Sequence, residues 1–298
     1  MKPTFLRFDL PIFGEVTFPA YMTMLMVGFM LALWVARREE DAYGGDGNLI
    51  VNMGFWMLVC GVLGARLMAV LVEGHFQDFI NLCVDPKLVP ADDAWAREVV
   101  CTADAQCTRG SAHYLCDAAT GSCYPEKDCL AVLKFWTGGL AFYGGLLLAA
   151  PVGLWYAHRH KLGVWRIGDM TAPWIMFGLA IGRIGCFFNG CCFGGESDSW
   201  WAMQFPRLPH PVHPTQLYES VAALAICAFT YFVVRPRKRA HGIIFGAMIA
   251  LYGVARFVLE YWRADERGEM FGLSSSQLIA IPMVLFGVWL LLTRKPKP

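Results

Sequence analysis

The sequence predicts an all-α, polytopic integral membrane protein with seven transmembrane helices and a small disulfide-rich extracytoplasmic insertion. Three observations support this fold class: an apolar composition, seven long apolar runs, and one polar segment rich in cysteine. Hydrophobic residues make up 56% of the 298 residues and charged residues only 16%. Soluble domains average about 45–50% apolar and roughly 25% charged residues, so lipid must solvate the apolar excess. A formal net charge of +1 argues against nucleic acid as a partner, because such proteins carry a basic face.

Seven apolar runs are long enough to cross a bilayer as helices. They cover residues 16–36, 49–72, 138–157, 167–188, 217–234, 242–262 and 277–293. In hydrocarbon every backbone polar group needs a partner within the segment, which makes runs of this length helical. The first run is too long for the apolar region of a signal peptide and is followed by Arg37 and Arg38. We therefore expect it to remain in the mature protein.

The short loops between these runs predict the orientation of the chain. Twelve Lys and Arg residues fall on one side of the predicted helices and five on the other. Positive charge accumulates in cytoplasmic loops, so the side with twelve is predicted to be cytoplasmic. With seven spans, the N-terminus is then periplasmic and the C-terminus cytoplasmic.

Residues 73–137 form a polar insertion between the second and third runs, on the predicted periplasmic side. Six of the eleven cysteines lie in it: Cys83, Cys101, Cys107, Cys116, Cys123 and Cys129. Cysteines of a small domain in an oxidising compartment usually form disulfides, but six cysteines allow fifteen pairings and the sequence does not select one. Zinc is the alternative; the insertion has no C-x2-C pair and only His113 as imidazole, so disulfides are favoured.

Three arginines, Arg66, Arg183 and Arg256, lie inside apolar runs near the predicted outer leaflet. A charged group at this depth costs about 2.5–3.5 kcal/mol on insertion scales and usually marks function, although arginines near helix ends also reach back to the headgroups. Glu260 follows Arg256 by four residues, so the two can pair on one helix face. The other two arginines have no acidic residue within one turn, which favours an external anion. Guanidinium groups bind phosphate in bidentate fashion, so we expect a phospholipid headgroup there.

Two loop segments contribute further candidates. Residues 182–194 combine many glycines with Asn189 and three cysteines, which predicts a tight re-entrant backbone whose N–H groups face an anion. Residues 213–219 place His213, Gln216, Tyr218 and Glu219 at the outer start of the fifth predicted helix. The alternative is a purely structural role, in which Thr215 caps this helix and Gln216 and Glu219 are ordinary first-turn residues. Near the third run, glycine pairs flank Tyr143 and would let helices approach closely.

With these motifs in view, the sequence resembles the prolipoprotein diacylglyceryl transferase family from about Tyr21 to the seventh predicted helix, apart from the cysteine-rich insertion. The similar segments are G-R-x-G-x-F-x-N-G at residues 182–190, H-P-x-Q-L-Y-E from His213, R-x-x-x-E at Arg256 and Glu260, G-x-R at residues 64–66, and the Tyr21 position. Several motifs in the same order on the same helices make the match specific.

The resemblance implies an inner-membrane enzyme that moves the diacylglyceryl group of phosphatidylglycerol onto the lipobox cysteine of a preprolipoprotein and releases glycerol phosphate. It implies no cofactor and no metal. By position, Arg183 and Arg256 would hold the phosphate, Glu260 would orient Arg256, and Tyr143 would complete the catalytic set. The implied lipid-binding residues are Arg183, Arg256, Arg66, Tyr21, Asn189, His213, Gln216, Tyr218 and Glu219.

Three positions depart from the family pattern. Tyr143 stands where the family usually has a His, and Cys186 and Cys191 stand where it has Asn and Glu. A tyrosine with an ordinary pKa of about 10 is a poor base at neutral pH. The acceptor thiol would then lose its proton in the field of the arginines or to His213, or the chain would have an altered activity.

Two other functions fit parts of the sequence. A non-catalytic phospholipid or lipoprotein binder on the same scaffold would explain the three departures. A membrane thiol oxidoreductase would use Cys186, Cys191 and Cys192, but no C-x-x-C pair is present and neighbouring cysteines close only a strained disulfide. A disulfide from Cys186 to Cys191 or Cys192 that shapes the loop is the preferred interpretation of these cysteines.

Overall fold

The computed structural model describes residues 4–10, 14–71, 76–91, 96–97, 99–109, 112–134, 141–205, 208–264, 269–270 and 272–294. The chain is mostly helical and divides into two compact units. The helical unit comprises Met1–Phe55 and Leu154–Pro298, and the insertion unit comprises Trp56–Gly153. Both boundaries fall inside helices, namely α2 (Gly47–Leu71) and α5 (Phe142–Arg159).

Six helices are long and apolar enough to cross a membrane, as expected for a polytopic membrane protein. They cover Ala20–Ala42, Gly47–Leu71, Val164–Asn189, Thr215–Arg237, Ile243–Trp262 and Ser275–Thr293. Each coincides with one of the predicted runs. The remaining run corresponds to α5, which is helical but is not among these six; residues 138–140 of that run lie outside the described residues. A seventh span therefore stays a prediction.

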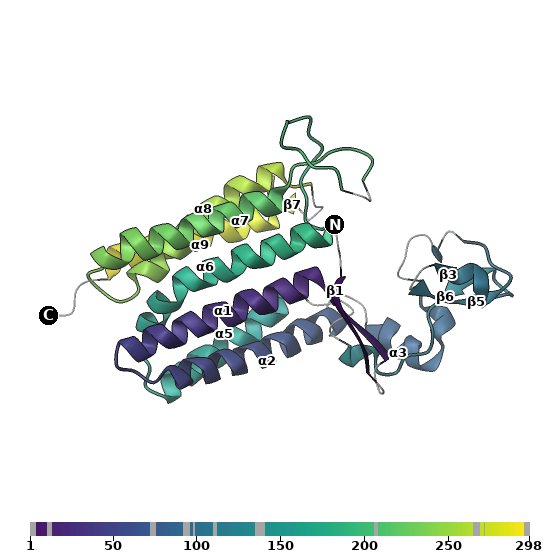
Figure 1. Cartoon of the computed structure of the whole chain (residues 1–298), viewed down its shortest axis with the longest axis horizontal. Coiled ribbons are helices and arrows are strands. Elements are labelled where there is room, and N and C mark those ends of the chain that lie inside the picture. Colours follow the sequence, from purple (N-terminus) through teal and green to yellow (C-terminus); the bar gives the residue numbers. More distant parts are fainter. Residues whose placement is uncertain are drawn as a thin grey trace. The chain divides into compact units, whose positions relative to one another are not determined.

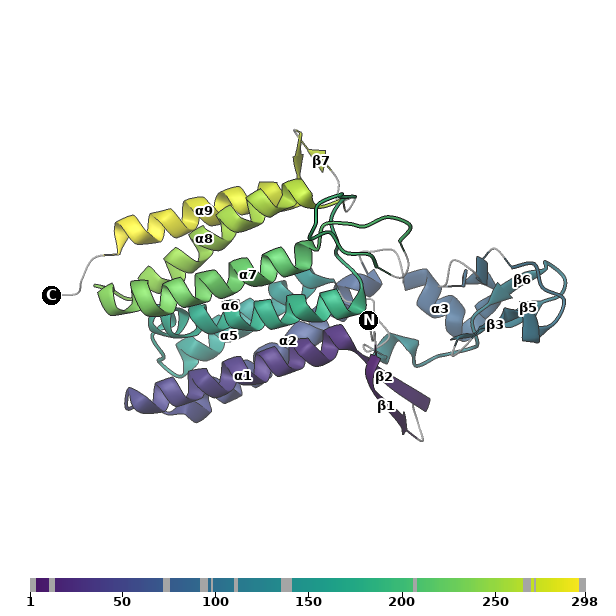
Figure 2. The same ribbon diagram turned by 45° about the horizontal axis from the view of Figure 1, so that its top comes forward.

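The helical unit is a bundle of α1 (Ala20–Ala42), α6 (Val164–Asn189), α7 (Thr215–Ala228), α8 (Ile243–Leu259) and α9 (Ser275–Thr293). Helix α6 packs against α1, α7 and α8, and α9 packs against α8 (Figures 1 and 2). Small residues allow this close packing. A Cβ atom on Gly28 of α1 would lie 3.0 Å from the carbonyl oxygen of Gly178 on α6, and one on Gly253 would lie 3.1 Å from that of Ala280.

The first helix differs from its predicted range at both ends. Residues 16–19 belong to β2 (Gly14–Pro19), which pairs with β1 (Thr4–Leu10) in an antiparallel hairpin, so α1 begins only at Ala20. The helix continues past the predicted end because its charged last turns find partners. The Glu39 Oε1 atom lies 2.6 Å from Nη1 of Arg235, and Glu40 pairs with Arg166 at the start of α6.

Short elements complete the helical unit. Helix α7 continues as a π-helical stretch, η5 (Phe229–Val234), and then as η6 (Arg235–Arg237). A short turn of helix, η7 (Glu260–Trp262), extends α8, and β7 (Glu269–Met270) pairs with β8 (Leu273–Ser274) before α9. The buried Asp169 carboxylate accepts hydrogen bonds from the backbone N–H groups of Gly242 and Phe245, at 2.8 and 3.0 Å, which fixes the start of α8 on α6.

The insertion unit has little regular structure beyond α2 and α5. It contains α3 (Phe76–Val84), η1 (Pro86–Leu88), η2 (Asp104–Cys107) and η3 (Ala131–Leu133). Its two short antiparallel pairs are β3 (Thr108–Arg109) with β4 (Ala112–His113) and β5 (Leu115–Asp117) with β6 (Ser122–Tyr124). Within the same unit, α2 and α5 meet at glycines: a Cβ atom on Gly145 would lie 3.1 Å from the Gly61 carbonyl oxygen.

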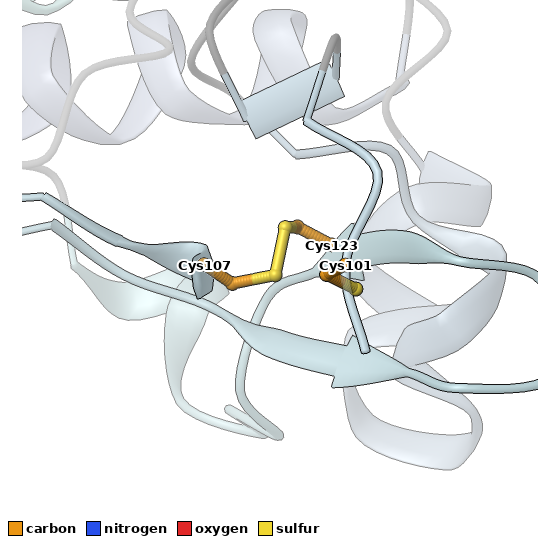
Figure 3. Close-up of side chains that lie close together, drawn as sticks. All are labelled: Cys101, Cys107 and Cys123. Carbon is orange, nitrogen blue, oxygen red and sulfur yellow. A yellow bond between two sulfur atoms is a disulfide. The ribbon is translucent and has the colours of Figure 1, made fainter. Parts of the chain in front are cut away.

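The six cysteines of the insertion form three disulfides. The pairs are Cys83–Cys129, Cys101–Cys116 and Cys107–Cys123. Figure 3 shows the bond between Cys107 and Cys123 beside the buried Cys101. Their sulfurs lie within 4.8 Å of one another, but a sulfur that is bound in a disulfide has no thiolate to offer a metal. This arrangement excludes the zinc alternative for these cysteines.

Candidate active site

A buried carboxylate on α7 is the centre of the site. The Glu219 side chain is 2% exposed, and its Oε1 lies 2.9 Å from Nη2 of Arg183 and accepts a hydrogen bond from the Tyr252 hydroxyl at 2.9 Å. The other oxygen, Oε2, lies 3.6 Å from Nη1 of Arg263, which follows η7. We call these four side chains the Glu219 cluster. Within these four side chains two guanidinium groups face one carboxylate, an arrangement that favours a further anion nearby.

A second ion pair lies one turn along α8 from Tyr252. Nη1 of Arg256 lies 2.9 Å from Oε2 of Glu260, which is the pairing that their spacing predicts. The start of α9 holds this pair: the Arg256 Nη2 group donates to Oγ of Ser276 at 2.9 Å, and the Ser274 hydroxyl donates to Oε1 of Glu260 at 2.7 Å. The Arg256 guanidinium is therefore fixed in one orientation.

Several backbone N–H groups of the glycine-rich segment after α6 bond to other backbone groups and therefore do not face an anion. The backbone N–H of Cys191 donates to the carbonyl of Cys186, at 3.2 Å, as the helix ends. The N–H groups of Gly194 and Gly195 donate to the carbonyls of His213 and Trp262, at 2.8 and 3.0 Å. These three groups are thus bonded to backbone oxygens. They join three segments of the chain, and a Cβ atom on Gly194 would collide with the Trp262 carbonyl oxygen.

The start of α7 holds the same segment from the other side. The Thr215 hydroxyl donates to the carbonyl of Cys192 at 2.9 Å, and Nε2 of Gln216 donates to that of Cys191 at 2.7 Å. The interpretation of Thr215 as a helix cap is wrong, because Pro214 precedes the helix and no side chain caps it. Gln216 is fully buried, and its Oε1 has no hydrogen-bond partner among the described residues.

His213 and Tyr218 are also paired. The Nδ1 atom of His213 lies 3.0 Å from the Tyr218 hydroxyl, and the Tyr218 ring meets the Trp262 ring edge-on. The 213–219 motif therefore lies against the end of α6.

Three free thiols converge at the end of α6. The Sγ atoms of Cys186, Cys191 and Cys192 lie within 4.8 Å of one another, and none of them is in a disulfide. The expected disulfide from Cys186 is therefore wrong. Hydrogen bonds from the other two thiols, together with the nearby guanidinium groups of Arg183 and Arg263, hold the pKa of Cys192 well below its ordinary value.

Tyr21 and Asn189 lie beside this group. A Cβ atom on Gly185 would lie 3.0 Å from the Tyr21 Cα atom, so the first turn of α1 rests on α6 one residue before Cys186. The Tyr21 side chain is about a third exposed. Asn189 ends α6, and its side chain hydrogen-bonds to Cys191.

Two predicted site residues, Arg66 and Tyr143, belong to the insertion unit. The Arg66 guanidinium donates to the backbone carbonyls of Ala131 and Val132, at 2.6 and 2.9 Å, and lies 4.8 Å from the centre of the Phe79 ring. The Tyr143 side chain is about half exposed, in the first turn of α5. Arg66 thus has partners within the protein, and so does Arg183 in Glu219. The expectation that Arg183 has no acidic partner in the chain is therefore wrong, because Glu219 is that partner; an external anion at Arg66 stays a prediction.

The sequence interpretation missed Arg263 and Tyr252. Arg263 is one of the five Lys and Arg residues that the loop count places on the predicted periplasmic side, yet its side chain is 2% exposed and faces Glu219. Residues 252, 256 and 260 are four apart and therefore lie on one face of a helix. This spacing is the signal that could have placed Tyr252 in the site together with Arg256 and Glu260.

Comparisons with known proteins identify the family. The model of the prolipoprotein diacylglyceryl transferase family matches residues 9–85 and 112–293. A curated phosphatidylglycerol–prolipoprotein diacylglyceryl transferase of Photobacterium profundum is 32% identical over 287 residues, which cover 94% of this chain and 90% of the relative. The Vibrio atlanticus protein of the same name is 32% identical over 92% of this chain and 86% of its own length. The protein of Vibrio cholerae is 30% identical over the same shares.

These matches cover both halves of the helical unit and every residue of the Glu219 cluster. Residues 86–111, in the insertion, lie outside the match to the family model. On this evidence, the chain belongs to the prolipoprotein diacylglyceryl transferase family.

Proposed function

We propose that this chain transfers the diacylglyceryl group of phosphatidylglycerol to the lipobox cysteine of preprolipoproteins and releases glycerol phosphate. The curated relatives carry the name of this activity. The observation that supports it best is the Glu219 cluster, in which Arg183 and Arg263 both face the Glu219 carboxylate. The lipid phosphate supplies the negative charge that this cluster attracts.

The surrounding residues have parts in lipid binding. Arg256, oriented by Glu260, adds a second guanidinium to the phosphate site. The buried Oε1 of Gln216, which has no partner among the described residues, accepts a hydrogen bond from a hydroxyl of the glycerol headgroup. A buried acceptor gains most from such a bond because it is otherwise desolvated without compensation. Tyr21, Asn189, His213 and Tyr218, all of the helical unit, line the lipid-binding region in this proposal. The part in lipid binding that the sequence predicts for Arg66, in the insertion unit, stays a prediction.

The chemistry is a displacement at carbon. The thiolate sulfur of the acceptor cysteine attacks the glyceryl carbon, an S–C bond forms, and the C–O bond to phosphate breaks. The electron pair of that bond leaves on the phosphate oxygen. Fixed guanidinium groups stabilise this developing charge, because they are already oriented and hydrogen-bond to phosphate oxygens in pairs.

The membrane orientation is part of the proposal. The protein lies in the bacterial inner membrane with seven spans, a periplasmic N-terminus and a cytoplasmic C-terminus, and its site faces the outer leaflet. The insertion 73–137 is then periplasmic, where its three disulfides are chemically stable. A reporter fused after Pro298 should be active in the cytoplasm, and a periplasmic signal would reverse the orientation.

The decisive experiment is transfer itself. The purified full-length protein, given phosphatidylglycerol and a lipobox peptide, should produce the diacylglyceryl thioether and glycerol phosphate. Arg183→Ala should lower the rate by about 10²–10³, the usual loss for one donor aimed at developing charge. Arg166→Ala is the matched control, because Arg166 is on the same helix and also pairs with a glutamate of a neighbouring helix. It should change the rate less than about tenfold.

The variant Tyr143→Phe tests whether Tyr143 acts as the general base or whether phosphate binding by the arginines dominates the rate. If the arginines dominate, this change should cost much less than Arg183→Ala. An equally severe loss would give Tyr143 the role of the missing family His. If the folded protein makes no product with any anionic phospholipid, the transferase proposal fails and a non-catalytic lipid binder takes its place.

A further inference from the structure

The three thiols of Cys186, Cys191 and Cys192 have no part in the lipid site described above. Their Sγ atoms lie within 4.8 Å of one another, although they come from the last turn of α6 and from the segment beyond it. The other two free cysteines, Cys60 and Cys227, are single. The convergence of three sulfurs on one point needs a chemical explanation.

The backbone that carries these thiols is held in place. Cys192 has a φ of +62°, in the left-handed region that costs free energy for any residue other than glycine. Buried side chains of α7 fix the carbonyls of Cys191 and Cys192, as described above. Strain that is maintained by surrounding contacts is typical of functional positions. The thiols are therefore preorganised.

Three soft sulfur ligands fit a thiophilic metal ion. Zinc binds thiolates at about 2.3 Å in a tetrahedron, whose edges are then about 3.8 Å. The thiols need to close by at most about 1 Å from the 4.8 Å limit to reach that geometry. In the described part of the chain, the metal-ligand side chains that converge here are these three cysteines alone. Three protein ligands with a fourth position open is the pattern of a catalytic zinc site.

We propose that Cys186, Cys191 and Cys192 bind one zinc ion and that its open position takes the thiol of the acceptor cysteine. The second half rests on the proposed transferase function. A thiol that coordinates a metal ion is deprotonated, and the thiolate is the nucleophile that the transfer needs. This site supplies the activation that is otherwise unassigned in a chain with Tyr143 at the position of the family His.

The proposed reaction moves protons to water and exchanges one bond at the glyceryl carbon for another. Each of the three cysteines releases its proton to water as its S–Zn bond forms, and the acceptor thiol releases its proton in the same way. The sulfur of the bound acceptor then forms the S–C bond to the glyceryl carbon, while the C–O bond to phosphate breaks and its electron pair leaves with glycerol phosphate. The oxidation state of zinc does not change, and the thioether product leaves the ion.

Metal binding can be measured without the transfer reaction. Cd²⁺ added to the metal-free full-length protein in detergent, with the three disulfides of the insertion left intact, should give the ultraviolet thiolate-to-cadmium band with a stoichiometry of one, and Zn²⁺ should displace it. Changes beyond the ligands commonly cost about 10–100-fold in metal affinity, so Cys191→Ser or Cys192→Ser should weaken binding by about 100-fold or more. Cys60→Ser and Cys227→Ser are matched controls and should bind like wild type.

Transfer assays then test the second half. Removal of the metal should lower the rate at neutral pH, and one equivalent of Zn²⁺ should restore it in wild type but not in Cys192→Ser. No cadmium band in the folded wild type, or a disulfide from Cys186 in the protein isolated without reductant, overturns the metal site. Full transfer after complete metal removal overturns the activation step while the transferase function stands. A zinc-loaded protein that makes no thioether refutes the transferase function instead, with the metal site intact.

Discussion

Two groups of three cysteines in this molecule each bring their sulfurs close together, but the sulfurs are bonded in one group and free in the other. The sulfurs of Cys101, Cys107 and Cys123 in the insertion unit lie within 4.8 Å of one another, as do those at the end of α6. Every cysteine of the first group is in a disulfide, and every cysteine of the second is a free thiol. Proximity of sulfurs therefore does not decide which state a cysteine takes.

The difference lies in what else stabilises each region. The insertion buries few large side chains; its buried cluster consists of alanines and cysteines. Small domains without a sufficient core depend on covalent links. The end of α6 is held instead by the buried charges around Glu219 and by hydrogen bonds from α7. It therefore does not depend on disulfides, and its three cysteines are free thiols. Removing each kind of link tests this contrast.

The largest effect should come from the centre of the site. Glu219→Gln leaves the guanidinium groups of Arg183 and Arg263 without their carboxylate. Breaking a buried ion pair from one side costs about 3–5 kcal/mol, so thermal unfolding of the helical unit should shift down strongly. Glu196→Gln, at an exposed carboxylate of the same unit, should shift stability by less than about 0.5 kcal/mol. Equal stability of the two variants would contradict the buried-charge account.

Removing one disulfide should have the next largest effect, confined to the insertion. Cys107 and Cys123 are 16 residues apart, and a loop of that length corresponds to about 3 kcal/mol of chain entropy in the unfolded state. The double change Cys107→Ala and Cys123→Ala should therefore increase protease cleavage and hydrogen exchange in the insertion. Cys60→Ala, which removes a free thiol of α2, serves as control. An insertion that stays fully protected would show that its fold does not depend on this link.

Reduction should affect the two regions unequally. Thiol counting on the denatured protein should give five free cysteines before reduction and eleven after it. A mild reductant should loosen the insertion and shift the unfolding of the helical unit by less than about 0.5 kcal/mol. A count of three before reduction would show a further disulfide among these five cysteines and would contradict the contrast.

The smallest effect concerns an exposed ion pair of the insertion. A hydrogen bond from the backbone N–H of Ala119, and one from Lys87 at 3.2 Å, hold the pKa of Asp117 below its ordinary value of 3.8. A lowered pKa stabilises the folded state above pH 3.8, and this stabilisation is lost as the pH falls through the lower, folded pKa. Near-ultraviolet circular dichroism of the insertion should therefore show a weak acid transition that Asp117→Asn removes.

Lys87 behaves in the opposite direction. Its hydrogen bond to Asp117 raises the pKa of Lys87 above 10.5. The resulting stabilisation is complete below pH 10.5 and is lost as the pH rises through the folded pKa. Lys87→Met should thus abolish an alkaline transition and reduce the acid one, whereas a change at the exposed Lys127 should do neither.

The helices and one ion pair could be predicted because their signals are local in sequence. Apolar runs mark the spans, and the four-residue spacing of Arg256 and Glu260 gave their contact. The start of α1 was wrong because β-pairing of residues 16–19 competes with helix formation there. Lipid exposure does not distinguish an apolar strand from the first turn of an apolar helix.

Contacts between distant segments could not be predicted from local spacing. Arg183 and Glu219 are 36 residues apart in sequence, so no helical period connects them, and Arg263 looked like an ordinary loop cation. The predicted disulfide from Cys186 was wrong, and the pairing in the insertion could not be predicted, for a related reason. Whether a thiol is bonded depends on which partner the fold presents to it, and the pairing of six cysteines is a property of the folded insertion.

The Cys83–Cys129 bond brings the two ends of the insertion to a Cα separation of 4.4 Å. Any single cut of the backbone between these residues leaves the two pieces covalently joined. A nicked chain should therefore migrate as one species in electrophoresis without reductant and separate into two fragments once reduced. The helices on both sides of the insertion therefore remain one molecule after such a cut.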